Sequence, residues 1–396
     1  MMKRILMICS NFYPNGSIVE AKNNYLTALE LEKNGYSVDV CTFESDGAQP
    51  DFVTHLVKKR TRVTFGKYYP HFRRLIRFPL CPISFSDVSV FLKTLSNIDM
   101  TIYDYVYTIF GGGSEHIVGQ LLKERNPHLK HIAEFRDPWV HNKIAKAYFF
   151  DNSNKWYGRI VWKMLMNKQR KLLDQVDMLL VESEGHANNI KRDFAYESDI
   201  FICNGFSNIY DICSIDINLN FPNQPVFGFV GSTYYGYEDV IQRFLDVLKE
   251  LQDEGYEFTL ISVGDNYFSR VCKRSEIKNF FAFAKVSYKR SLGFIKKIDI
   301  GLAIISEDYD TINSKIFEHM QFGKYTLAIS PKNGVMDRML RGANAGHSIS
   351  YDRMEMKEHL KAIIENESIP KVKECDVIKY SRSNMFSSII QELDKI

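Results

Sequence analysis

Short apolar runs alternate with segments of helical periodicity along the whole chain, and this alternation limits the fold more than any other feature. The first half contains the strand-like runs RILMIC, SVDVCTF, DYVYTI, KHIAEF, VDMLLV and DIFIC. The second half contains VFGFVG, FTLISVG, NFFAFA, DIGLAII and YTLAIS. Strands that alternate with helices are typical of parallel sheets covered by helices on both faces. The pattern therefore predicts an α/β protein built on parallel sheets.

The length of 396 residues favours two domains. The periodicity lapses around 204–225, a stretch with several Asn and two Pro, so we place the boundary there. We predict a Rossmann-like acceptor-binding domain over 1–205 and a Rossmann-like nucleotide-sugar domain over 220–375. A helix over 376–396 should pack back towards the first domain. Helices are expected over 21–33, 238–253, 288–297, 314–321 and 353–365. Two open sheets facing a central cleft place ligands beyond the carboxyl ends of their strands.

The composition is that of an ordinary globular protein, with 45% hydrophobic and 25% charged residues and a net charge of +3. Seven scattered cysteines form no CxxC pair, which predicts reduced thiols and a cytoplasmic protein without structural zinc. No apolar run reaches the length of a membrane-spanning helix or a signal-peptide core. We expect no metal and no cofactor.

The segment SEDYDTINSKIFEHMQFGKYTLAIS carries the clearest chemistry. A helix that begins near Asn313 and Ser314 presents free backbone N–H groups to an anion, and Lys315 adds a full charge, so a diphosphate fits there. Glu318 lies one turn further along, where a carboxylate can accept hydrogen bonds from ribose hydroxyls. The alternative is a capped amphipathic helix in which Glu318 is solvated.

NSKIFEHMQFGKY resembles the nucleotide-sugar motif of GT-B glycosyltransferases, particularly retaining family 4 members, whose pattern approximates P-S-K-x-F-E-Y-x-x-x-G-K-P. Asn313 and Tyr325 stand where the family favours proline. The resemblance implies that Glu318 binds the ribose. It also implies that Asp310, eight residues earlier, contacts the donor sugar at the catalytic centre.

AEFRDPW, residues 133–139, is similar to the D-F-R-D-P-W motif of a subgroup of the same enzymes. Arg136 supplies a cation for phosphate and Asp137 a carboxylate for a sugar hydroxyl or the acceptor, and Trp139 offers a stacking face. We therefore predict Arg136 and Asp137 as active-site residues. The alternative is a structural Arg–Asp pair at a turn.

Glycines after strands complete the predicted donor site. The resemblance places Gly16 in the loop after the first strand, and Gly231, Ser232 and Gly264 beside the donor. The G-x-G-x-x-G pattern of dinucleotide sites is absent. The Arg and Lys pair common in the family is also absent, since GSTYYGYED follows the strand, so Lys315, the helix start and Arg136 would neutralise the diphosphate.

Two stretches, 58–78 and 155–173, mix basic and aromatic residues. Such surfaces suit an anionic bilayer, which predicts peripheral contact with the inner face of the cell membrane. Solvated helix faces are the alternative. Nucleic acid is not an expected partner, because no nucleic-acid-binding signature accompanies the charge.

The sequence therefore predicts a retaining, hexosyltransferase-like enzyme. It would move a sugar from a UDP- or GDP-sugar to a glycan or lipid-linked acceptor, as in surface polysaccharide, lipopolysaccharide, capsule or glycolipid assembly. One alternative is a GT-B nucleotide-sugar epimerase, although the carboxylate and histidine set usual in those enzymes is not evident. Another is a non-catalytic protein that binds a nucleotide sugar or glycan.

Overall fold

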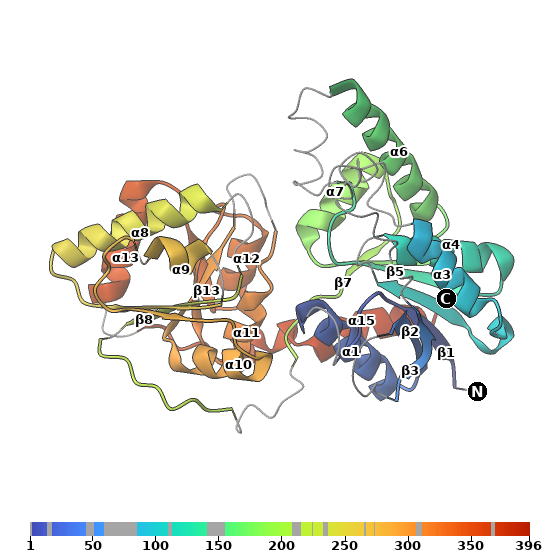
Figure 1. The fold of residues 1–396 in the computed structure, drawn as a ribbon, viewed down its shortest axis with the longest axis horizontal. Coiled ribbons are helices and arrows are strands. Elements are labelled where there is room, and N and C mark those ends of the chain that lie inside the picture. Colours follow the sequence, from blue (N-terminus) through green and yellow to red (C-terminus); the bar gives the residue numbers. More distant parts are fainter. Residues whose placement is uncertain are drawn as a thin grey trace, which may run out of the picture. The chain divides into compact units, whose positions relative to one another are not determined.

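The chain forms two compact units, which Figure 1 draws as ribbons. Unit 1 comprises Met1–Cys203 together with Phe386–Ile396, and unit 2 comprises Asn204–Met385. The computed structural model describes residues 2–13, 18–44, 51–58, 85–109, 113–140, 155–207, 215–223, 225–232, 237–264, 267–272, 274–305, 311–365 and 369–396.

Unit 1 is built on a seven-stranded parallel sheet with strand order β3-β2-β1-β4-β5-β6-β7. Its strands are β1 Arg4–Ile8, β2 Ser37–Phe43, β3 Val53–Val57, β4 Tyr105–Ile109, β5 Lys130–Phe135, β6 Met178–Val181 and β7 Ile200–Ile202. Both faces of the central strands are apolar, since β1 turns Leu6 and Ile8 into one core and Ile5 and Met7 into the other. Such strands require cover on both sides, which the helices supply.

The helices of unit 1 divide between the two faces of its sheet (Figure 1). They are α1 Ile18–Lys33, α3 Phe85–Leu95, α4 Ser114–Arg125, α6 Lys155–Leu173, α7 Glu184–Phe194 and α15 Arg382–Leu393, with a short 3-10 turn at Met100–Ile102. Helices α3, α4, α6 and α7 pack on one face, and α1 and α15 pack on the other.

The C-terminal helix α15 supplies part of the core of unit 1. Its residues Phe386, Ile389 and Leu393 are fully buried and pack in the same cluster as α1. The hydroxyl of Tyr36 donates to the carboxylate of Asp394 over 2.7 Å, and the hydroxyl of Tyr105 donates to the carbonyl of Leu393 over 2.7 Å. The last residues of the chain are therefore fixed to the first unit by burial and by hydrogen bonds.

Unit 2 is built on a six-stranded parallel sheet with strand order β10-β9-β8-β11-β12-β13. Its strands are β8 Val226–Val230, β9 Thr259–Val263, β10 Phe280–Phe283, β11 Ile300–Ile304, β12 Tyr325–Ile329 and β13 Gly346–Ile349. Its helices are α8 Glu238–Asp253, α9 Tyr267–Cys272, α10 Tyr288–Lys297, α11 Lys315–Gln321, α12 Val335–Gly342, α13 Arg353–Glu365 and α14 Glu374–Val377, followed by a 3-10 turn at Ile378–Tyr380. Helices α8, α9 and α13 pack on one face of the sheet, and α10, α11, α12 and α14 pack on the other.

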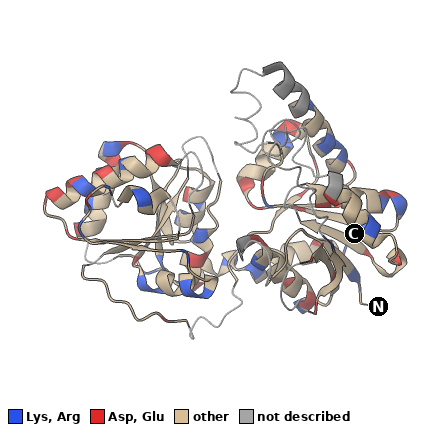
Figure 2. Cartoon of the chain, viewed as in Figure 1, with Lys and Arg blue, Asp and Glu red and all other residues tan. Residues whose placement is uncertain are grey.

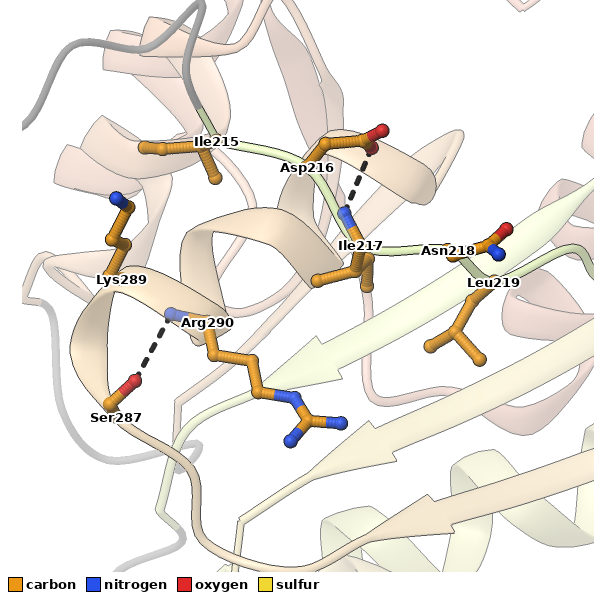
Figure 3. A pocket seen from close by; sticks show the side chains of 8 residues that line it. All are labelled: Ile215, Asp216, Ile217, Asn218, Leu219, Ser287, Lys289 and Arg290. Atoms are coloured by element: carbon orange, nitrogen blue, oxygen red, sulfur yellow. Dashed lines mark hydrogen bonds between the residues drawn. The ribbon is translucent and has the colours of Figure 1, made fainter.

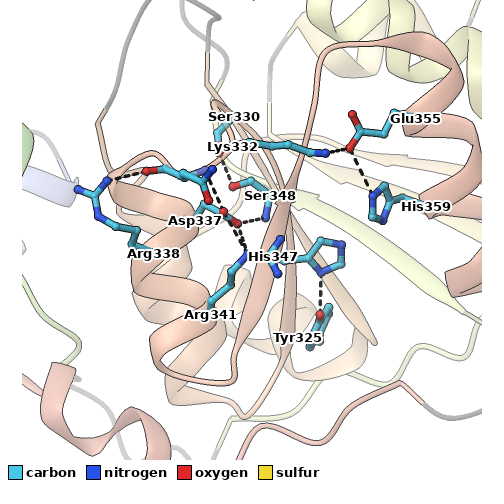
Figure 4. Close-up of polar contacts among 11 residues, drawn as sticks. Tyr325, Ser330, Lys332, Asp337, Arg338, Arg341, His347, Ser348, Glu355 and His359 are labelled. Carbon is cyan, nitrogen blue, oxygen red and sulfur yellow. Dashed lines mark hydrogen bonds and ion pairs between the residues drawn. The ribbon is translucent and has the colours of Figure 1, made fainter.

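A polar network holds the β13 edge of the unit 2 sheet in place (Figure 4). Asp337 on α12 is buried and accepts hydrogen bonds from the backbone N–H groups of Asn333 and Ser348 and from Arg341. These contacts outweigh the cost of burial and lower the pKa of Asp337. Tyr325 on β12 and His347 on β13 are also joined by a hydrogen bond of 2.7 Å. Side-chain bonds thus anchor a strand that has little apolar surface of its own.

The predicted fold class is confirmed, because the chain forms two α/β domains with all-parallel sheets. Two strands, β3 and β13, were not predicted from the sequence. In VTHLV the polar pair Thr54 and His55 interrupts the apolar residues, and GHSI has only one large apolar residue, so neither forms a continuous apolar run. Within the described residues no helix is long and apolar enough to cross a membrane.

Removal of the Phe386 ring should destabilise unit 1 strongly. Phe386→Ala leaves a cavity in a fully buried cluster, and we expect a loss of about 3–5 kcal/mol in the free energy of unfolding. Urea unfolding followed by tryptophan fluorescence measures it. The matched control is Gln391→Ala, an exposed residue of the same helix, which should change stability by less than about 0.5 kcal/mol. Equal midpoints for the two variants would contradict the role of α15 in this core.

Candidate functional site

The predicted donor residues lie on the segments that follow three neighbouring strands of unit 2, β8, β9 and β11. β8 pairs in parallel with β9 on one side and with β11 on the other, so their carboxyl ends meet at one edge of the sheet. Gly231 and Ser232 follow β8, and Gly264 follows β9. Helix α11 begins at Lys315, after the connection that leaves β11. Parallel pairing thus brings together loops that are far apart in the sequence.

Lys315 lies directly against the backbone of Gly231. A Cβ atom built on Gly231 would stand 3.3 Å from Cε of Lys315, so a side chain at position 231 would press on the lysine. The φ of Gly231 is 151° and that of Gly264 is 126°, values that L side chains rarely adopt. The two glycines therefore allow the turns after β8 and β9, and Gly231 also makes room for Lys315.

The backbone amides at the start of α11 already have partners. The N–H of Lys315 donates to Oδ1 of Asn313 over 3.1 Å, and the N–H of Ile316 donates to the carbonyl of Asn313 over 3.1 Å. The N–H of Phe317 donates to the carbonyl of Ser314 over 3.3 Å. The expectation that the helix start near Asn313 and Ser314 presents free N–H groups is wrong for these three amides, because the Asn313 side chain bonds the first and backbone carbonyls of the same turn bond the other two. Positive charge at this point comes from the Lys315 ammonium.

Lys315 and Glu318 form an ion pair that is largely shielded from water. Nζ of Lys315 donates to Oε2 of Glu318 over 2.7 Å, with side-chain exposures of 20% and 10%. Glu318 is therefore buried at the carboxyl edge of the sheet, and the alternative in which it is a solvated surface residue is excluded. Lys315 therefore places a positive charge beside this buried carboxylate.

The neighbouring His319 has a structural role. It is fully buried, its Nδ1 is 3.1 Å from Oγ1 of Thr326, and its ring lies against Gly301 of β11. Burial lowers the pKa of His319 to about 4, so the imidazole is neutral near pH 7. His319 fixes α11 to the sheet, as a buried histidine with a hydrogen-bond partner does.

Several predicted features lie outside the described residues. These are Gly16, Asp310 and positions 59–84, which include nearly all of the first basic aromatic stretch. The second stretch forms α6.

Arg136 and Asp137 stand directly after β5, at the carboxyl edge of the unit 1 sheet. Nε of Arg136 donates to Oε1 of Glu134 over 2.7 Å, and its Nη2 donates to Oγ1 of Thr27 over 3.3 Å. The hydroxyl of Tyr107 donates to the other oxygen of Glu134 over 2.6 Å. The partner of the Arg136 guanidinium is thus Glu134, a carboxylate that the sequence analysis did not single out. Asp137 itself is exposed.

Trp139 is a core residue, which corrects the expectation of a stacking face for a ligand. Its ring is 2% exposed and lies against Gly113, where a Cβ atom would come within 2.9 Å of the indole. Phe135 and His116 also contact it. The turn at Pro138 directs the indole into the apolar cluster beneath α4, so it has no free face to offer.

Three further carboxylates occupy the same edge of unit 1, and sequence reasoning missed them. They are Glu20 on α1, Glu115 in the first turn of α4 and Glu182 after β6. Nδ2 of Asn11 donates to Glu20 over 2.9 Å, and Nδ1 of His186 lies 2.6 Å from Glu182. The one sequence feature that could have identified these carboxylates is their position at the start of a helix or the end of a strand. That position is common for solvated acids near helix N-termini as well, so it did not distinguish them.

Glu115 is the most perturbed of these acids. It is fully buried, and the Ser10 hydroxyl donates to its Oε1. Burial raises the pKa of Glu115 to about 7, and the negative charges of Glu20 and Asp87 act in the same direction. Burial also raises the pKa of Glu20. Desolvation followed by the charge of Glu182 raises that of Asp137, an effect that water weakens because Asp137 is exposed.

Two other kinds of site were looked for among the described residues, a metal site and a surface pocket. Among the described residues no group of three His, Cys, Asp or Glu side chains is placed to hold a metal ion. A surface pocket in unit 2 lies between residues 215–219 and the start of α10, with Asp216, Lys289 and Arg290 in its lining (Figure 3). It shares no residue with the predicted donor site.

The fold is shared with several solved structures, although no protein-family model and no curated protein sequence matches the chain. The lipopolysaccharide outer core galactosyltransferase WaaB superposes with a TM-score of 0.61 at 13% identity, covering 99% of both chains. The N-terminal domain of Candida albicans trehalose-6-phosphate phosphatase gives 0.65 at 11% identity, covering 100% of this chain and 97% of that one. UDP-GlcNAc 2-epimerase from Methanocaldococcus jannaschii gives 0.52 at 12% identity, covering 100% of both chains. At these identities the likeness establishes a common two-domain fold.

The stability of unit 1 should depend on pH through Glu115. An acid whose pKa is about 7 in the folded state and 4.5 when unfolded binds more protons when folded, so its contribution is complete below about pH 4.5 and is lost by about pH 7. At about 1.4 kcal/mol per pH unit, wild type should lose up to about 3 kcal/mol relative to Glu115→Gln over this range. Urea unfolding at pH 4.5 to 8 measures the difference.

The control for this titration is Glu124→Gln, which changes an exposed glutamate at the far end of the same helix. Its unfolding free energy should follow that of wild type at every pH. A constant offset between wild type and Glu115→Gln would show that Glu115 does not titrate with the raised pKa.

Proposed function

We propose that this chain is a glycosyltransferase. It would bind a UDP- or GDP-sugar at the carboxyl edge of the unit 2 sheet and transfer the sugar to a glycan or lipid-linked acceptor at the carboxyl edge of the unit 1 sheet. The observation that carries the proposal is the shielded Lys315–Glu318 pair packed against Gly231. The fold shared with the WaaB galactosyltransferase supports it.

The pair provides both charges that a nucleoside diphosphate requires. The Lys315 ammonium has three N–H donors and uses one on Glu318, so it can donate to a diphosphate oxygen while keeping that bond. The Glu318 carboxylate can accept hydrogen bonds from ribose hydroxyls through its remaining lone pairs. Lys315 would thus bind phosphate while it remains bonded to Glu318. Gly231, Ser232 and Gly264 allow the ligand to approach the backbone after β8 and β9.

The remaining roles follow the resemblance to retaining family 4 enzymes. Asp310 would contact the donor sugar at the catalytic centre, with Asn313 and Ser314 beside the phosphates and Gly16 in the loop after β1. Asp137 would accept a hydrogen bond from a hydroxyl of the acceptor or sugar. The Arg136 charge is already matched by Glu134, so Arg136 would add a donor to a phosphate oxygen and little net charge. We expect no metal in this reaction, because Lys315 stabilises the leaving diphosphate.

Loss of the Glu318 charge should weaken nucleotide binding. For both Glu318→Gln and Glu318→Ala we expect a 10- to 100-fold higher Kd for the UDP or GDP that binds wild type, because a charged hydrogen bond is worth about 1.5–3 kcal/mol. Isothermal titration calorimetry measures the Kd, and circular dichroism checks the fold. Glu358→Gln, an exposed glutamate of the same unit, is the control and should bind as wild type does. An unchanged Kd in the Glu318 variants would remove the assigned role.

An epimerase is the alternative, because UDP-GlcNAc 2-epimerase shares the fold over the whole chain. The two activities differ in what happens to the donor. An epimerase converts a UDP-sugar into its epimer without an acceptor, whereas a transferase releases the nucleotide diphosphate and makes a new glycosidic bond. Chromatography of UDP-GlcNAc incubated with the protein separates them. A binding protein without catalytic activity would return the UDP-sugar unchanged under all conditions.

We also propose that α6 contacts an anionic membrane surface. Lys163, Arg170 and Lys171 are exposed on this helix, as is Met164 at 42%, while Leu165 and Leu172 are buried. Lys and Arg follow one another along its described part (Figure 2). An exposed cationic and apolar face on a helix anchored by its other face suits the headgroup region of a bilayer.

Charge removal on α6 should weaken vesicle binding. Each cation contributes about 1 kcal/mol near an anionic surface, so Lys163→Gln/Lys171→Gln should reduce the partition coefficient by roughly 30-fold. Sedimentation with vesicles containing phosphatidylglycerol at low salt measures it, and high salt should abolish wild-type binding as well. Lys371→Gln/Lys373→Gln, two exposed lysines of unit 2, are the matched control. Failure of wild type to bind these vesicles would end the membrane proposal.

A further inference from the structure

The guanidinium group of Arg136 is held by bonds to two different elements of unit 1. Its Nε donates to Oε1 of Glu134 on β5 over 2.7 Å, and its Nη2 donates to Oγ1 of Thr27 on α1 over 3.3 Å. Because a guanidinium is rigid and planar, one bond at Nε and a second at Nη2 fix the orientation of its plane. Arg136 is therefore anchored between the end of β5 and helix α1.

Glu134 is itself fixed, so it gives Arg136 a rigid support. The Tyr107 hydroxyl on β4 donates to its Oε2 over 2.6 Å, while Arg136 occupies its Oε1. Glu134 and Tyr107 are both buried, and Ile132, which lies on the same side of β5 as Glu134, belongs with Tyr107 to the core cluster beneath α1 and α15. A buried ion pair contributes little to stability. The fold therefore does not need this pair, which agrees with a role in ligand binding.

Arg136 keeps N–H groups that no residue in the described part of the chain occupies. A guanidinium has one N–H on Nε and two on each Nη, which makes five donors. Glu134 takes the donor on Nε and Thr27 takes one on Nη2, so both N–H groups of Nη1 are unbonded. The Arg136 side chain is 14% exposed at the carboxyl edge of the unit 1 sheet, and Nη1 is accessible to solvent. A ligand at this edge can therefore reach Nη1.

We propose that Glu134 is a positioning residue, which holds the Arg136 guanidinium so that the N–H groups of Nη1 donate to a phosphate oxygen of the substrate. That Arg136 contacts a phosphate rests on the proposed function. Because the charge of Glu134 balances that of Arg136, the pair supplies oriented donors and little net charge. A donor that is already oriented loses less entropy when the ligand binds. Affinity for the phosphate therefore depends on the direction of the guanidinium, which Glu134 sets.

The proposal is tested with two ligands that differ only in phosphate. UDP or GDP, whichever binds wild type, and its nucleoside are titrated by calorimetry into wild type, Glu134→Leu and Glu134→Gln, and circular dichroism checks the fold. Glu134→Leu removes the acceptor of Nε, so its Kd for the nucleotide should rise about tenfold while its Kd for the nucleoside stays unchanged. Glu134→Gln keeps an oxygen that accepts from Nε, so it should bind the nucleotide within about threefold of wild type. An equal loss for nucleotide and nucleoside would contradict the proposal.

A double-mutant cycle shows whether Glu134 acts through Arg136. Arg136→Ala alone should raise the Kd for the nucleotide about tenfold. Glu134→Leu/Arg136→Ala should bind no more weakly than Arg136→Ala, since no guanidinium is left to position. A further loss of about tenfold in the double variant would show that Glu134 acts by another route and would overturn the proposal. Glu124→Gln, an exposed glutamate of the same unit, is the control and should bind as wild type does.

A second titration identifies the source of the phosphate, which is either the donor nucleotide or a phosphate-bearing lipid acceptor. Geranyl diphosphate and geraniol are titrated into the nucleotide-saturated wild type and the same variants. A loss in Glu134→Leu that is confined to the nucleotide assigns the contact to the donor, and a loss confined to geranyl diphosphate assigns it to the acceptor. Unchanged affinity of Glu134→Leu for both ligands overturns the positioning role.

Failure of this inference is distinguishable from failure of the proposed function. If the nucleotide binds through Glu318 and a sugar is transferred, yet Glu134→Leu binds both phosphate ligands as wild type does, only the role of Glu134 is wrong. If no nucleotide or nucleotide sugar binds or turns over, the transferase proposal fails and this inference fails with it.

Discussion

Parallel pairing of every strand is the constraint on which the chemistry of this protein depends. In a parallel sheet each connection must return across a face, and all carboxyl ends point to one edge. Gly231 and Lys315 are 84 residues apart in the numbering of the chain, yet they are in contact because β8 and β11 are neighbours. The same rule gathers Glu20, Glu115, Asp137 and Glu182 on unit 1. Polar residues from distant segments can thus share one site without any long-range motif in the sequence.

The Lys315–Glu318 pair illustrates how such a site is maintained. Burial of an ion pair contributes little to stability, because the desolvation of both charges offsets their attraction. An apolar pair of similar size would hold α11 to the sheet at least as well. Two shielded charges beside a glycine are therefore not needed for the fold, which agrees with the proposal that they bind a charged ligand. His319 on the same helix is neutral and fully buried, and it joins α11 to β11 and β12.

The sequence predicted much of the fold because periodicity and capping are local. The bounds of α8 and α10 agree with their predicted ranges, and Ser287 caps α10 as a serine at that point should. Strand β13 escaped prediction because Ile349 is its only large apolar residue, while contacts such as the hydrogen bond from the Ser348 N–H to Asp337 hold it in place. These bonds come from a helix and a loop that no local pattern connects to the strand.

The candidate sites were only partly predictable for the same reason. Glu318 was identified because its spacing from Lys315 lies within one helical turn. Trp139 was assigned to a ligand, but tertiary packing against Gly113 buries it. Burial is the main cause of the raised pKa of Glu115, and Ser10, Glu20 and Asp87, which come from three other segments, modify it. A pKa that depends on burial and on such neighbours is a property of the folded chain, so the local sequence does not predict it.

The position of α15 has a consequence for how the protein is made. One face of the unit 1 sheet is completed by residues that are translated after the whole of unit 2, long after its own strands have been synthesised. Until then, the apolar surface that Phe386 and its neighbours will cover has no partner from this chain. The first unit must therefore wait for the second to be translated, and the growing chain needs protection from aggregation throughout that interval.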